Sequence, residues 1–169
     1  MKETTISVKK YILIYGFILG LIWIIYGVLR HISDTKTTAN WALSIFELFL
    51  HIGIIAYGIY RFKTKNDGFL TLWQAFKIGI GIVLICTLMQ LIWDIIFVKV
   101  ISPETIQDII NSTNPSTSTA SQEQNGLLSN ENNYLFNRFL TGLIFHSTLG
   151  TLVSLLGGAF MQKNRDPFH

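Results

Sequence analysis

Glu47 and His51 are residues whose types and spacing could do chemistry inside a membrane. They lie four positions apart in a long apolar stretch, so on a helix their side chains share one face and can hydrogen-bond each other. His146 lies in another apolar stretch, and an imidazole with its ordinary pKa near ~6.5 changes charge close to physiological pH. A carboxyl group and two imidazoles could together bind protons or, in principle, one metal ion.

Two further charged residues complete a candidate intramembrane polar site. Arg30 and Asp94 are expected at the same membrane face, so Arg30 is a candidate partner for either Glu47 or Asp94. A charged side chain near the centre of a spanning helix costs about 3 kcal/mol, so an acid there is expected to be paired or protonated. One interpretation is a proton- or cation-responsive site, and the other is a cluster with a purely structural role. The candidate residues are Arg30, Glu47, His51, Asp94 and His146.

The motifs of common enzyme classes are absent from the sequence. There is no GxSxG, no HExxH and no phosphate-binding glycine loop. The single cysteine, Cys86, leaves no partner for an intrachain disulfide or a CxxC motif. We therefore predict a protein that is not an enzyme and that has no cofactor or metal site. Nucleic acid is not an expected partner, because the basic residues flank apolar runs instead of forming a patch.

The elements that must position these residues are four long apolar runs. Of the 169 residues, 50% are apolar and 14% are charged, whereas roughly 25% are charged in a typical soluble domain. We expect helices at about 11–29, 39–60, 70–98 and 137–162, each long enough to cross a bilayer. The predicted fold class is an all-α membrane protein, a four-transmembrane-helix antiparallel bundle forming a single transmembrane domain over residues 1–169, with the lipid bilayer as its surroundings.

The connections and their charges predict the orientation of this bundle. One face is expected to hold eight lysines and arginines, namely Lys2, Lys9, Lys10, Arg61, Lys63, Lys65, Lys163 and Arg165. The other face is expected to hold four, namely Arg30, Lys36, Lys99 and Arg138. The excess of positive charge predicts that both termini are cytoplasmic. The third connection, 99–136, is a predicted polar extracytoplasmic loop with a short helix at about 103–110, because Ser102-Pro103-Glu104 is typical of a helix start.

Small residues at helical spacing predict where the helices pack closely. His146 belongs to a stripe in which a small residue recurs about every four positions, so His146 should face a neighbouring helix instead of lipid. On the first helix, a GxxxG pair could serve packing inside the bundle or dimerisation, and we favour packing inside the bundle. The predicted helix-packing residues are Gly16, Gly20, Gly142, Gly150, Ser154 and Gly158.

On the third helix, a rotation of 100° per residue places Ala75, Gly79, Cys86 and Gln90 on one face, which we expect to be packed. Lys77 falls on the opposite side near the cytoplasmic end. Its long stem can carry the ammonium group to the lipid headgroups there. We therefore expect Lys77 to snorkel to the interface instead of forming part of a binding site.

A resemblance to a known family rests on the start of the third run. Residues 68–81 read GFLTLWQAFKIGIG, after a basic second loop and before a long third loop that opens with Ser-Pro-Glu. This pattern resembles the bacterial family called domain of unknown function 4199 over most of the chain. Its most specific residues are Gln74, Ala75, Phe76, Lys77 and Gly79. The resemblance implies a four-span protein of the bacterial inner membrane and no established reaction, substrate or cofactor. It also makes Lys77 a candidate motif residue.

Two functional hypotheses follow from these observations. The first is a non-enzymatic accessory or interaction subunit, whose partner would be another membrane protein or a second copy of the chain. It rests on the missing catalytic motifs and on the small-residue stripes. The second is a proton- or small-solute-handling transporter or channel that uses Glu47, His51 and His146. Convergence of these side chains on one cavity would favour the second hypothesis.

Overall fold

The computed structural model describes residues 7–33, 41–101 and 131–163, with side chains in the last range from residue 135 onward, and the elements in this part are all helices. They are α1 (Val8–Ile32), α2 (Trp41–Lys65), α3 (Leu72–Ile96), the π-helical turn η1 (Phe97–Ile101) and α6 (Glu131–Met161). Four of them are long and apolar enough to cross a membrane. A helix of 25 residues is about 37 Å long, which exceeds the roughly 30 Å of the hydrocarbon core. The predicted class, an all-α membrane protein with four spans, is confirmed.

α1 extends further than its predicted range at both ends, α2 at its C-terminal end and α6 at its N-terminal end, whereas α3 lies within the predicted range 70–98. The basic residues that flank the apolar runs stay helical, as Lys9 and Lys10 do in α1 and Lys65 does in α2. Charged side chains can continue a helix into the headgroup region, because only hydrocarbon excludes them. Likewise α6 begins at Glu131 instead of 137. The short helix expected at about 103–110 lies outside the described residues.

Backbone signals end α2 and begin α3. Asp67 and Gly68 have positive φ angles of 55° and 79°, which reverse the chain after α2. Thr71 then caps α3: its side-chain oxygen accepts a hydrogen bond from the Gln74 backbone N–H, and the Gln74 side chain accepts one from the Thr71 N–H. Next to this cap, Leu70 and Lys163 exchange two backbone hydrogen bonds of 3.0 Å, which join the start of α3 to the end of α6.

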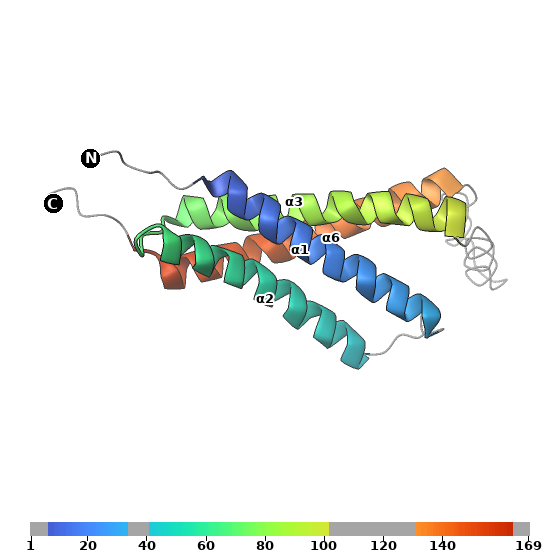
Figure 1. Cartoon of the computed structure of the whole chain (residues 1–169), viewed down its shortest axis with the longest axis horizontal. Helices are drawn as coiled ribbons and strands as arrows, with labels where there is room; N and C mark the ends of the chain where they lie inside the picture. The colour runs from blue at the N-terminus through green and yellow to red at the C-terminus, as the bar shows by residue number, and fades with distance from the viewer. Residues whose placement is uncertain (1–6, 34–40, 102–130, 164–169) are drawn as a thin grey trace, which may run out of the picture.

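Figure 1 shows how the four long helices are arranged. α1 and α3 begin, and α2 and α6 end, at one end of the molecule, which we call the basic end because Lys9, Lys10, Arg61, Lys63, Lys65 and Lys163 lie there. We call the opposite end the far end. α3 packs against α1 and α6 along most of its length. Toward the far end, α2 diverges from α3 and α6 (Figure 1), whereas α1 keeps contacts with α3 and η1 through Gly27–Trp93 and His31–Phe97.

The packed core lies in the half of the bundle nearer the basic end. Its fully buried side chains come from α1, α2 and α3: Leu19, Ile55, Ile59, Phe62, Ala75, Ile78, Ile82, Val83 and Cys86. Within the described residues, Gly20 is the last buried position of α1 and His51 the first of α2. In the described part of the chain, the far half contains only the small separate cluster of Val98, Leu135 and Phe97, and the two histidine-bearing helices meet at the border of the main core.

Small residues bring α3 close to its neighbours. A β-carbon added to Gly79 would lie 2.5 Å from the β-carbon of Ser154, and one added to Gly150 would lie 2.5 Å from Val83 Cγ2. Gly158 similarly contacts Ala75. These contacts fit α6 against α3 without room for larger side chains.

The other predicted packing glycines divide into two groups. Gly16 and Gly20 of α1 lie against Ile85 and Met89 of α3, so the GxxxG pair is used inside the bundle. The prediction that Gly142 packs closely against another helix is wrong, because no described atom lies within 4 Å of where its β-carbon would be. It belongs to the far half of α6, where the helices diverge (Figure 1).

Candidate functional site

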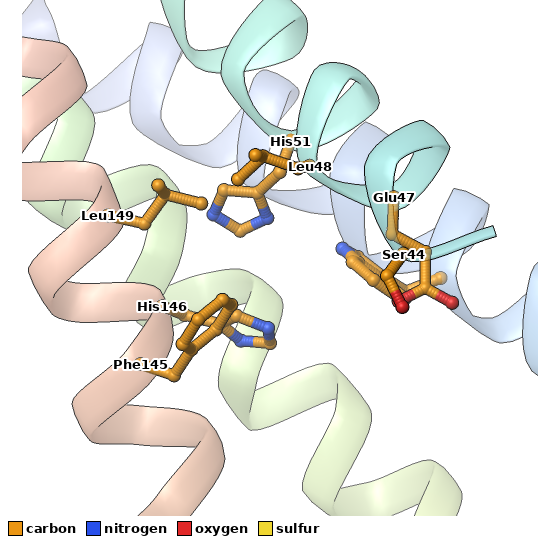
Figure 2. Close-up of a pocket in the computed structure, with 8 residues that line it drawn as sticks. Ser44, Glu47, Leu48, His51, Phe145, His146 and Leu149 are labelled. Atoms are coloured by element: carbon orange, nitrogen blue, oxygen red, sulfur yellow. The ribbon is translucent and has the colours of Figure 1, made fainter. Parts of the chain in front are cut away.

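His51 of α2 and His146 of α6 stack on each other across the space between their helices. Their ring centroids are 4.9 Å apart and their planes differ by 26°. Both residues are buried, with relative exposures of 1% and 8%. Trp23 of α1 lies beside them, with ring centroids 5.8 Å from His146 and 6.4 Å from His51. Figure 2 shows the two imidazoles facing each other.

The polar atoms of this aromatic group lack hydrogen-bond partners in the described part of the chain. These are both ring nitrogens of His51, Nδ1 of His146 and Nε1 of Trp23. The hydrogen bond expected between Glu47 and His51 is therefore not formed. Leaving a buried polar group without a partner costs about 1–3 kcal/mol. Such a group of unpartnered atoms on a cavity wall is typical of a site that takes up water or another small polar species.

A cavity of about 190 Å³ adjoins the histidine pair. α1 contributes Trp23 to its wall, whereas α2 and α6 contribute Ser44, Glu47, Leu48, His51, Phe145, His146 and Leu149. In Figure 2, Ser44 and Glu47 lie on α2 to one side of the pair. Three predicted site residues, Glu47, His51 and His146, therefore meet at one cavity.

Arg30 joins this group through an ion pair. Its Nη1 lies 3.4 Å from Oε1 of Glu47, linking α1 to α2, and the two side chains are 27% and 24% exposed. Of the two acids that Arg30 could have paired with, the structure places it on Glu47. A partly buried carboxylate is stabilised by such a partner, so the cavity carries one compensated acid next to two imidazoles.

Asp94 does not belong to the same site. Its Oδ2 lies 2.7 Å from Nε of Arg138, so it links α3 to α6, and it does not line the cavity. The sequence predicts Asp94 near Arg30, because both are expected at the far end, and it places Arg138 at the same membrane face without predicting that it pairs with Asp94. In the structure α6 begins before Arg138, which brings its guanidinium alongside α3.

Sequence reasoning also missed Trp23, Ser44 and Phe145. Trp23 offered a signal, because it lies in the middle of its apolar run, whereas tryptophan in spanning helices is enriched at the interfaces. Ser44 and Phe145 gave no signal, because their place in the wall depends on how α2 and α6 cross.

The family-motif residues lie at the start of α3, away from the cavity. Gln74 forms the helix cap, Ala75 and Gly79 pack against α6, and Phe76 stacks on Trp73 with ring centroids 5.4 Å apart. Lys77 is exposed, and its Nζ lies 5.1 Å from the centroid of the Trp73 ring. The contacts of this motif are those of a packing and capping segment, and Lys77 does not contribute to the cavity wall.

Among the residues that the structure describes, no group of three or more His, Cys, Asp or Glu side chains is placed to hold a metal ion. Glu47, His51 and His146 line the same cavity, but they do not form such a group.

The fold and this site together define a class: a multi-pass membrane protein with a polar cluster between its spans. The model of the family described as "Protein of unknown function (DUF4199)" matches residues 14–163. The chain belongs to this family. A search of curated proteins gave no significant match, and neither did a search of solved structures.

Proposed function

We propose that this protein is a proton-responsive membrane protein in which the pair His51–His146 binds the proton. The observation that carries the proposal is the stacking of two buried imidazoles, with three of their nitrogens unpartnered, on the wall of one cavity. Histidine is the side chain whose ordinary titration falls in the physiological range.

The geometry links proton binding to the packing of two helices. Two positive charges 4.9 Å apart would repel each other by about 3 kcal/mol at an effective dielectric constant of ~20. Protonation of both rings thus places two like charges between α2 and α6. We expect acidification to push these helices apart, while at neutral pH the rings stay stacked.

The other ionisable groups near the pair are few. Glu47 faces the cavity from α2, and Arg30 of α1 is bound to Glu47. The ionisable groups of α3 in its apolar stretch are Lys77, Cys86 and Asp94, and none of them lines the cavity. On α1, Trp23 lies in the wall and does not titrate, and Tyr26, whose phenol ordinarily titrates near pH ~10, contacts Trp23 and the Arg30 guanidinium. The histidines are therefore the groups best placed to respond to pH.

This role is non-enzymatic, and its output is a movement between helices. The other hypothesis, an accessory subunit that binds a partner through its small-residue stripes, has less support. Gly16, Gly20, Gly79, Gly150 and Gly158 are occupied by contacts inside the bundle, so they offer no free packing surface. A proton-coupled transporter shares the same site and differs in whether the proton can leave on the opposite side.

We further propose that the protein lies in the bacterial inner membrane with both termini in the cytoplasm. The positive charge at the basic end supports the orientation. The bacterial location follows from what the family resemblance implies.

The experiment is a distance measurement between α2 and α6 in the full chain reconstituted in vesicles. With Cys86 replaced by alanine, spin labels at Phe49 and Ile144, which are both exposed, report the distance at pH 8 and pH 4. We expect a longer distance at pH 4, and the increase should vanish in His146→Asn. His31→Asn is the matched control and should keep the increase, because His31 contacts Phe97 instead of the pair. A distance that is the same at both pH values would contradict the proposal.

A further inference from the structure

The cavity lies at the border between the packed and the open half of the bundle. On α2, the buried positions begin at His51 and continue toward the basic end through Ile55, Ile59 and Phe62. Ser44 and Glu47 lie on the other side of His51, one to two helical turns nearer the far end, and neither is buried. The cavity wall therefore follows α2 from His51 toward the far end.

The path from the histidine pair toward the basic end is closed by packed side chains. Ile55, Ile59, Ile78 and Ile82 have no exposed surface. On the α6 side, the contacts Gly79–Ser154 and Gly150–Val83 leave no space between α3 and α6. Ser154, the buried polar residue on that path, already donates its hydroxyl to the Gly150 carbonyl at 2.6 Å. Beyond the pair, the described side chains between these helices provide no chain of buried polar groups that could conduct a proton.

The side of the cavity toward the far end is polar. Glu47 and Arg30, whose side chains are partly exposed, form an ion pair there. The cavity volume of about 190 Å³ is large enough for several water molecules. Water is the partner that the unpartnered nitrogens of His51, His146 and Trp23 require.

From this geometry we infer that the cavity is a water-filled vestibule that opens to the far end and is closed to the basic end. The histidine pair therefore exchanges protons with one side of the membrane only. This interpretation of the vestibule rests on the proposed function. The protein then senses the pH of one compartment and does not conduct protons. In the orientation proposed above, that compartment is extracytoplasmic.

The test is cysteine labelling of the full chain in vesicles with a membrane-impermeant, thiol-reactive sulfonate, applied from one side and then from the other. Cys86→Ala removes the native thiol. Single cysteines then replace Ser44 or Leu48, which line the cavity. Phe49→Cys is the matched control, because Phe49 lies next to Leu48, is 70% exposed in the structure and is absent from the cavity wall. Trp41→Cys and Lys65→Cys mark the far and the basic side.

We expect Ser44→Cys and Leu48→Cys to react from the side that labels Trp41→Cys. Their rates should exceed that of Phe49→Cys by roughly tenfold or more, because the reactive thiolate forms in water and not in hydrocarbon. Reaction from the side that labels Lys65→Cys, or from both sides, would overturn the one-sided vestibule. Rates equal to that of Phe49→Cys would show that lipid fills the space, which also overturns it.

This readout is independent of histidine titration. One-sided labelling without any pH-dependent movement between α2 and α6 would refute the proposed function and keep the vestibule. A pH-dependent movement with labelling from both sides would keep the proposed function and refute the one-sided vestibule. Circular dichroism and thermal unfolding of each variant distinguish a change in access from a failure to fold.

Discussion

Arg30 and Glu47 form the contact that positions the polar side of the cavity. The guanidinium of Arg30 reaches from the last turns of α1 to the carboxylate on α2, where few apolar side chains hold the two helices together. An ion pair that is about three-quarters buried contributes mainly by keeping either charge from being buried alone. Arg30 therefore serves mainly to compensate the charge of Glu47, and the pair as a whole adds little to the stability of the fold.

This compensation predicts an asymmetry between single and double substitutions. Arg30→Ala should lower stability by about 1–2 kcal/mol, less than the loss for a fully buried pair, because water screens these partly exposed charges. Adding Glu47→Gln should recover part of the loss, since no uncompensated charge remains. Thermal unfolding in detergent measures both, and Lys99→Ala, at an exposed site, is the control. A double variant less stable than Arg30→Ala would contradict this account.

The residues of the site were partly predictable from the sequence. Glu47, His51 and His146 are recognisable because ionisable side chains are expensive in apolar runs. Their partners are not recognisable in this way: whether Arg30 binds Glu47 or Asp94 depends on how α1, α2 and α3 cross. Arg138 precedes the fourth apolar run, so its contact with Asp94 cannot be predicted from hydropathy alone.

At the scale of elements, α3 and α6 form the closest helix pair through their small residues. A β-carbon at Gly79 would come within 2.5 Å of the Ser154 β-carbon, whereas one at Gly142 would meet no described atom within 4 Å. The same substitution by alanine at Gly79 and at Gly142 should therefore change the stability of the protein differently.

We expect Gly79→Ala to destabilise the protein by about 1–3 kcal/mol, because it forces two packed helices apart. Gly142→Ala should be neutral or stabilise by up to about 1 kcal/mol, because alanine favours a helix more than glycine does. Thermal unfolding of both variants under the same conditions gives the comparison. Equal losses would show that the contact between α3 and α6 is not the cause.

The number of helices was predictable because each needs a long apolar run, but the helix ends were not. Hydropathy ends at the first charged residue, whereas α2 continues through Arg61, Lys63 and Lys65 to a turn with positive φ angles. The start of α3 depends on the Thr71–Gln74 capping box, a backbone signal that apolar runs do not contain.

Thr71→Ala should therefore lower the free energy of unfolding by about 1 kcal/mol, because it removes this cap. Thermal unfolding measures the loss, and Thr64→Ala, at an exposed position, is the control.

At the scale of the whole molecule, charge is distributed unequally between the two ends. The ion pairs Arg30–Glu47 and Asp94–Arg138 lie toward the far end, whereas Lys9, Lys10, Arg61, Lys63, Lys65 and Lys163 gather at the basic end. This asymmetry predicts a single orientation in the membrane.

Cysteines at Lys65 and Lys163 should react with an impermeant reagent from the cytoplasmic side of inverted vesicles, and one at Lys99 should not. Reaction of all three from one side would contradict the four-span topology.

Packing is distributed unequally as well, and this gives the two halves different stabilities. Local opening requires little energy where few apolar contacts must break, so the far half should open more readily than the core around Ile55 and Ile82. In detergent micelles, we expect the backbone amides of residues 42–49 in α2 to exchange with deuterium faster than those of residues 54–62. The α3–α6 contact around Gly79 and Ser154 should be the slowest region. If α2 exchanged uniformly along its length, the far half would be as tightly packed as the core, and the histidine pair would not lie at a border at all.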